Sequence, residues 1–383
     1  MTRYTKYRDQ RKTLCYRNGW PNHDISTLKL LQIVHRHGDR APTESYFPPN
    51  DPYKSIKYWP MGFNELTALG RYRMYSFGQF IRQEYHNYFG EQYSPREVYA
   101  RSSLTDRCLE SVSCLLAGAY PPKHFNWKWN DSTGSQQLSS VWQPITVETF
   151  MPRNKDYTLN SRHCPICDLE LSRVLQSTGV QQFLKENNQF YRYLSDIVGT
   201  DIVTIADAHR LHDLLDIEIS NDFYWSHIWS KTEQLSIVNR LRESHIMSYT
   251  IGWNSSVFKR FKAGGLIKEL TANIMNVLNK LNDSKKLYVY STHDINIIAL
   301  LHALDIYDHN LPPFGASFLF ELHRKSVIIG KAAKATNYDY FVRLFYFNDS
   351  FTGTPYHIKL TNLFYCYVYL LVDILMQFMA DLV

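Results

Sequence analysis

The chain has 383 residues, of which 44% are apolar, 15% aromatic and 20% charged. This length exceeds what one compact core usually encloses, and the composition excludes a disordered or low-complexity protein. The 42 basic residues outnumber the 36 acidic residues by only six, a mild surplus that suits an anionic small molecule better than nucleic acid.

The first third of the chain predicts strands that alternate with helices. Residues 1–24 are basic and lack the apolar segment of a secretory signal peptide, so we interpret them as a basic N-terminal extension. Residues 27–34 predict a buried strand. After a proline-rich turn segment, Asn64 is the expected N-cap of a long helix. Residues 97–100 predict a second strand and residues 106–117 a second helix.

The middle of the chain predicts helices and almost no strands. The clearest helical patterns cover residues 235–247 and 266–281. Beyond them the pattern returns to strand, helix, strand and strand, at 286–290, 295–304, 316–322 and 340–347.

This order of elements predicts the fold class. We expect a three-layer α/β core with a mostly parallel central sheet, built from residues 25–120 and 282–360. Residues 121–281 would form an inserted, mainly helical cap lobe. Residues 361–383 predict an amphipathic C-terminal helix packed on the body, and their apolar run is too short to span a membrane.

The six cysteines do not define a metal site. Cys164 and Cys167 have the spacing of a zinc knuckle, but no second pair follows at the distance that a structural zinc needs. One or two disulfides and buried thiols remain alternative interpretations.

Three of the predicted strands end in polar residues: 35–40, 101–103 and 291–294. In open α/β sheets, ligands bind beyond the carboxyl ends of the strands, so these residues would meet in one crevice. Any one of the three could be a surface loop, a helix cap or an ion-pair partner, but their shared placement favours a site.

The residue types in this crevice are suited to phosphate chemistry. The guanidinium groups of Arg36, Arg40 and Arg101 would clamp a phosphoryl group. They would also lower the pKa of His37, which keeps this histidine nucleophilic in acid. Asp294, at a helix start beside His293, could act as the general acid if a bound phosphate raises its pKa. The combination predicts an acidic pH optimum.

The motif Arg36-His37-Gly38-Asp39-Arg40-Ala41-Pro42 resembles the signature of the histidine acid phosphatases, the prostatic and lysosomal group of the histidine phosphatase superfamily. The resemblance extends from about residue 28 to residue 359. Further matching segments are 66–70, 101–107, 261–265, 290–294, 311–314 and 346–348.

The resemblance implies specific roles for these residues. His37 would accept the phosphoryl group, Asp294 would protonate the leaving alcohol, and His293 would bind phosphate. The remaining phosphate ligands would be Arg36, Arg40 and Arg101, whereas His35 would be structural. No metal or other cofactor is implied, because the arginines supply the positive charge.

The resemblance also implies a biological setting. The substrate would be a small phosphate monoester or a phosphorylated peptide or lipid, in a secreted or lysosomal protein that forms homodimers as several family members do. Four Asn-x-Ser sequons, at Asn130, Asn254, Asn282 and Asn348, fit a secreted glycoprotein. The alternative is a catalytically inactive phosphate-ester-binding protein of the same fold.

Overall fold

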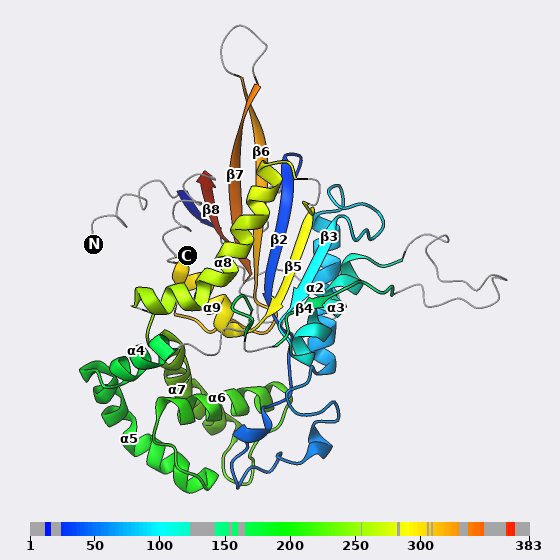
Figure 1. Cartoon of the computed structure of the whole chain (residues 1–383). Coiled ribbons are helices and arrows are strands. Elements are labelled where there is room, and N and C mark those ends of the chain that lie inside the picture. The colour runs from blue at the N-terminus through cyan, green and yellow to red at the C-terminus, as the bar shows by residue number, and fades with distance from the viewer. Residues whose placement is uncertain are drawn as a thin grey trace, which may run out of the picture.

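The computed structural model describes residues 12–16, 24–122, 142–152, 155–159, 165–253, 255–281, 284–304, 306–307, 309–328, 336–347 and 365–371. Its centre is a sheet in which the strands follow the order β1-β8-β7-β6-β2-β5-β3-β4 (Figure 1). The strands are β1 (Lys12–Tyr16), β2 (Leu28–Arg36), β3 (Val98–Ser102), β4 (Glu148–Thr149), β5 (Leu287–Thr292), β6 (Ser317–Ile328), β7 (Thr336–Phe347) and β8 (Tyr365–Leu371).

The strands beneath the predicted site are parallel. β2 pairs with β5, β5 with β3, and β3 with β4, all in the parallel sense. On the other side of β2, the pairs β2–β6, β6–β7, β7–β8 and β8–β1 are antiparallel. Six of these eight strands therefore run in one direction and only β6 and β8 are reversed, which confirms the mostly parallel sheet.

Helices cover both faces of the sheet (Figure 1). α2 (Ala68–Glu84) and α3 (Asp106–Ala119) pack on one face, and α8 (Ser256–Leu278) and α9 (Asp294–Ala303) on the other. Alternate side chains of β2 enter the two cores, because successive residues of a strand point to opposite faces. Leu31 and Ile33 pack with α2 and α3, and Leu30 and Val34 with α8 and α9. Burial on both faces explains the uninterrupted apolar run of β2.

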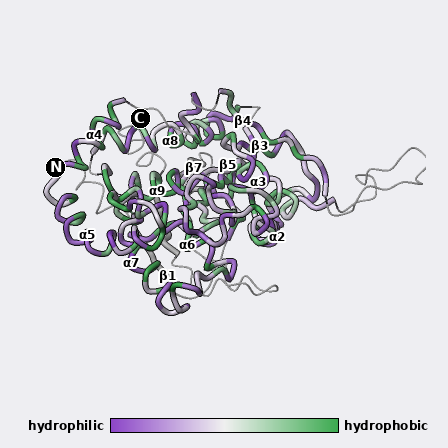
Figure 2. Tube along the Cα trace, turned by 90° about the horizontal axis from the view of Figure 1, so that it is seen from below, coloured by the Kyte–Doolittle hydropathy of each residue, from purple (hydrophilic) through white to green (hydrophobic). Residues whose placement is uncertain are grey.

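A separate group of helices lies beyond the carboxyl ends of β3 and β5 (Figure 1). Its members are α4 (Pro165–Leu175), α5 (Thr178–Val198), α6 (Ile205–Ser220) and α7 (Lys231–Thr250). Trp225 and Trp229 stack in a small apolar core of their own between α5, α6 and α7. We call α4–α7 the helical lobe. Figure 2 shows its α5 as largely hydrophilic, whereas hydrophobic stretches surround α9, β5 and β7.

Two short 3₁₀ turns lie between β2 and α2: η1 (Glu44–Tyr46) and η2 (Ile56–Tyr58). In Figure 1 this connection runs beside the helical lobe. It contacts the lobe directly, since the hydroxyl of Tyr53 donates to the carbonyl oxygen of Tyr224 at 2.6 Å.

The structure corrects the predicted elements at four points. Thr67, and not Asn64, caps α2 through a side-chain bond to the amide of Gly70. α8 packs on the sheet, so the insertion ends before residue 281. β1 lies within the segment interpreted as a bare extension. Residues 365–371 form strand β8 instead of a helix, because a short apolar run fits both periods and the edge of β7 accepts it.

The described residues include no helix long and apolar enough to cross a bilayer. Cys108 and Cys114 are free thiols, whereas Cys164 and all four sequon asparagines lie outside the described residues.

Candidate active site

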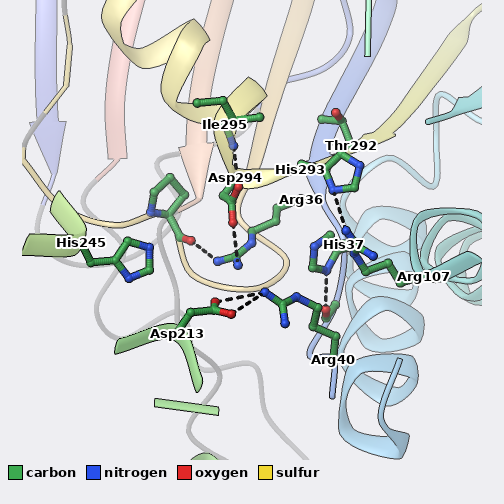
Figure 3. A network of polar contacts seen from close by, with 12 residues as sticks. Arg36, His37, Arg40, Arg107, Asp213, His245, Thr292, His293, Asp294 and Ile295 are labelled. Atoms are coloured by element: carbon green, nitrogen blue, oxygen red, sulfur yellow. Dashed lines mark hydrogen bonds and ion pairs between the residues drawn. The ribbon is translucent and has the colours of Figure 1, made fainter. Parts of the chain in front are cut away.

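The polar residues predicted at three strand ends do meet. The parallel register places Arg36 beside Thr292, and Ser102 beside Ser291. The residues that follow these strands therefore emerge at one edge of the sheet, against the helical lobe (Figure 3). They line a cavity of about 760 Å³, the phosphoryl cavity, whose wall includes His37, Arg40, Arg107, His293, Asp294 and the lobe residues His209, Asp213 and Tyr249.

His37 is buried and has a defined tautomer. Its Nδ1 lies 2.8 Å from the carbonyl oxygen of Gly38, and a carbonyl oxygen can only accept a hydrogen bond. Nδ1 therefore carries the proton and Nε2 keeps its lone pair. Burial and the charges of Arg107 and Arg36 hold the pKa of His37 well below its usual value. The imidazole therefore stays neutral, with the lone pair of Nε2 free, even in moderate acid.

Asp294 begins α9 and is held at both oxygens. The backbone amide of Ile295 donates to Oδ1 at 2.7 Å, and Nη2 of Arg36 lies 2.9 Å from Oδ2 (Figure 3). Burial alone would raise the pKa of Asp294, but Arg36, His293 and Arg40 together lower it to about 2. A negative group close to these cations would oppose that effect and favour the protonated acid.

Arg36 and Arg40 point from the end of β2 toward the helical lobe. Nη1 of Arg36 donates to the carbonyl oxygen of Pro312 at 2.6 Å, and its guanidinium carbon lies 4.1 Å from the centre of the Phe314 ring. Nη2 of Arg40 contacts both carboxylate oxygens of Asp213, at 3.0 and 2.8 Å. Asp213 belongs to α6, so the lobe and the sheet meet in this ion pair.

The structure replaces Arg101 by Arg107 in the candidate site. Arg101 lies within β3 and is bound to Asp156 at 2.8 Å and to Glu269 at 2.6 Å, outside the cavity wall. Arg107 lies in the first turn of α3 and lines the cavity. Among the charged neighbours of His37, it lowers the pKa of that histidine most. The prediction for Arg101 is therefore wrong.

His293 stands between Arg107 and the end of β3. Its Nε2 lies 3.0 Å from the hydroxyl oxygen of Ser103, and Nη2 of Arg107 donates to its Nδ1 at 3.4 Å. The ring is nearly perpendicular to that of His37, with 5.6 Å between their centres. His293, which follows β5, thus lies beside His37 in the wall of the same cavity.

Other residues of the wall were not predicted. Arg107 had a signal, since it follows the strand and starts a helix, whereas Arg101 lies inside the strand. His209, Asp213 and Tyr249 had none, because they come from helices far along the chain and form no motif with residues 36–40. His35 is buried, donates to the carbonyl oxygen of Arg36 at 3.0 Å and lies outside the cavity wall, in keeping with a structural role.

Comparisons with known proteins agree with this geometry. The model of the histidine phosphatase superfamily, branch 2, matches residues 27–347. The chain is 31% identical to prostatic acid phosphatase of Homo sapiens over 87% of its own length and 80% of that protein. It is 29% identical to lysosomal acid phosphatase of Rattus norvegicus over 85% and 71%. Its fold is similar to that of the phytase from Citrobacter braakii, with a TM-score of 0.64, 14% identity, and 93% and 98% of the two chains covered.

Proposed function

Because the chain belongs to branch 2 of the histidine phosphatase superfamily, we propose that it is an acid phosphatase that hydrolyses phosphate monoesters through a phosphohistidine intermediate. The observation that carries this proposal is the free Nε2 of a buried neutral His37 among Arg36, Arg40 and Arg107, with Asp294 at the same cavity.

In the first step, the lone pair on Nε2 of His37 forms the N–P bond. The bond between phosphorus and the alcohol oxygen breaks, and its electron pair stays on that oxygen. Asp294, protonated in the complex, gives its proton to the leaving oxygen, so a neutral alcohol departs. Arg36, Arg40, Arg107 and His293 would hold the phosphoryl oxygens and stabilise the charge that develops on them.

In the second step, water attacks the phosphorus of phosphohistidine. The Asp294 carboxylate takes one proton from that water, the N–P bond breaks, and its electron pair returns to Nε2 of His37. Inorganic phosphate is released and Asp294 is again protonated, so both groups return to their starting states. The arginines supply the positive charge of the site, and we therefore expect no metal requirement.

The geometry also supports the expectation of an acidic optimum. The low pKa of His37 keeps its nucleophilic nitrogen free below neutral pH. The pKa of Asp294 is lowered to about 2 in the protein alone. Its carboxyl is therefore protonated only when a phosphoryl group lies nearby and the solution is acidic. We further infer a secreted or lysosomal location, as the names of its relatives suggest.

The test is hydrolysis of para-nitrophenyl phosphate between pH 4 and 7 in the presence of a chelator. We expect activity in the wild type and its loss in His37→Ala. In Asp294→Asn, the activated phenol can leave without an acid, but the attacking water lacks its base. This variant should therefore accumulate phosphoenzyme, which can be trapped by quenching in alkali.

The matched control is Asp201→Asn, which removes an exposed carboxylate outside the cavity wall and should retain full activity. Phosphate-ester binding without turnover by the wild type would instead establish an inactive binding protein. Undiminished activity of His37→Ala would rule out the histidine mechanism.

A further inference from the structure

A second cavity of about 620 Å³ adjoins the phosphoryl cavity. Its wall includes Arg36 and Phe314 but not His37, and the two cavities share Asp213, Tyr249 and Asp294. In Figure 3, Asp294 and Arg36 lie between His37 and His245, and His245 lines the second cavity. The residue proposed to protonate the leaving alcohol thus faces both spaces.

One side of the second cavity is apolar and begins at the reactive centre. The ring of Phe314 lies 5.7 Å from the ring of His37, measured between centres, and 4.1 Å from the guanidinium carbon of Arg36. Further apolar residues continue this wall: Ile217, Val238, Leu311, Pro312 and Pro313. A slender apolar group attached to a phosphate on His37 could therefore pack along this wall and lose its contact with water.

The other side of the second cavity presents a carboxylate that forms no ion pair with another described residue. Four aspartates line this cavity, and arginines bind three of them. The three pairs are Asp39 with Arg73, Asp213 with Arg40, and Asp294 with Arg36. The fourth is Asp216 on α6, whose side chain is exposed and takes part in no ion pair within the described ranges. A charged group in a recess without a partner is suited to a ligand of opposite charge.

We propose that the second cavity receives the leaving alcohol, and that the enzyme prefers phosphate esters whose alcohol carries a primary ammonium group on an apolar stem. This inference rests on the phosphatase function proposed above. The ester oxygen lies at Asp294, the stem packs on Phe314 and its apolar neighbours, and the ammonium group binds Asp216. The three contacts follow the cavity from the reactive centre outward.

The preference should depend on pH. Although Asp216 is accessible to solvent, the protein atoms packed around its carboxylate disfavour the charged form. Together with the charge of Asp213 they raise the pKa of Asp216 to about 6, against the opposing effect of Arg36 and Arg242. His212 and His245 also line the cavity. Burial lowers the pKa of both, so both stay neutral between pH 5 and 7. Asp216 therefore gains its negative charge between pH 5 and 7, and selectivity for the ammonium should rise with it.

The experiment compares 4-(2-aminoethyl)phenyl phosphate with 4-propylphenyl phosphate, which replaces the ammonium by a methyl group of similar size. The wild type should show the higher kcat/KM for the amine, with a ratio that increases from pH 5 to pH 7. Asp216→Asn should lower this ratio about tenfold, since a charged hydrogen bond is lost. Both esters are measured on the same preparation, so the folded fraction cancels from the ratio.

Two variants make the result specific. Asp201→Asn removes a carboxylate outside both cavities and should keep the wild-type ratio. Lys262→Met removes a positive charge from the wall of the phosphoryl cavity only. If the alcohol lay in that cavity, the loss of repulsion would raise the ratio, and a raised ratio in this variant would overturn the inference. A ratio near one in the wild type, or an unchanged ratio in Asp216→Asn, overturns it while the phosphatase function stands. Failure to hydrolyse either ester overturns both proposals.

Discussion

At the scale of single residues, two arginines six positions apart have different surroundings. Arg101 is bound by Asp156 and Glu269, whereas Arg107 faces the phosphoryl cavity. The side chain of Arg101 is only 13% exposed and that of Asp156 only 2%. Arg101 therefore contributes to the stability of the fold, and Arg107 to the proposed phosphate site.

This difference predicts opposite effects of the same substitution. Arg107→Met should lower kcat/KM for para-nitrophenyl phosphate by roughly 100-fold or more, as the loss of a charge-stabilising donor does, with little change in the melting temperature. Arg101→Met should lower the free energy of unfolding by about 3 kcal/mol, because it leaves Asp156 buried without its partner. Steady-state kinetics and urea denaturation of both variants check this, and equal kinetic defects would contradict it.

Site residues are easiest to predict from the sequence where they form a local motif. Residues 36–40 and 293–294 were predictable because each group is a local motif at the end of a strand. The choice between Arg101 and Arg107 had only a weak signal, the position of Arg107 at the start of a helix, because Arg101 is held away from the cavity by Asp156 and Glu269, which lie far along the chain. Asp213 and Tyr249 reach the site only through tertiary packing, and no local pattern marks them.

At the scale of elements, a pair of carboxyl groups links α6 of the helical lobe to the connection between β2 and α2. Burial raises the pKa of both Glu218 on α6 and Asp51 on the connection. The charge of Asp51 raises the pKa of Glu218 further, whereas the hydrogen bond with Glu218 lowers that of Asp51. The indole nitrogen of Trp225 donates to Glu218 at 2.8 Å, and the amide of Tyr53 donates to Asp51 at 2.6 Å. The folded protein therefore retains a proton that the unfolded chain releases above the ordinary pKa of glutamate.

Retention of that proton makes stability depend on pH. The free energy of unfolding should fall as pH rises from about 5 to 8, by up to about 1.4 kcal/mol per pH unit for one retained proton. Glu218→Gln keeps an acceptor for Trp225 and a donor for Asp51 but has no proton to lose, so its stability should change less over this range. Urea denaturation at pH 5 and pH 8 measures both slopes, and parallel slopes would show that the pair holds no proton.

The layered fold could be predicted because its elements are long and patterned, such as β2 with its apolar run and α7, whose helical pattern was expected over residues 235–247. The short C-terminal run could not be, since seven residues satisfy a period of 2.0 and a period of 3.6 equally well. These residues form a strand because they pair with the edge of β7, and their partners on β7 lie more than twenty positions earlier in the chain.

At the scale of the whole molecule, the site lies between bodies with separate apolar cores. The α/β body supplies His37, which follows β2, and Arg107 on α3, and the lobe supplies Asp213 on α6. A ligand that contacts both should stabilise the whole protein in proportion to RT ln(1 + [L]/Kd). Inorganic phosphate should raise the melting temperature of the wild type in a calorimetric scan and have a much smaller effect on Arg107→Met. An equal rise in both proteins would place the bound phosphate elsewhere.

The position of β2 has a consequence for how the protein is made. This strand is among the first to leave the ribosome, yet both of its neighbours, β5 and β6, begin only at residues 287 and 317. The middle of the sheet must therefore stay unpaired while about 250 further residues are synthesised, with an apolar strand exposed throughout. Nascent chains of this protein should depend on chaperones until synthesis is nearly complete, and a truncation before β6 should yield no folded core.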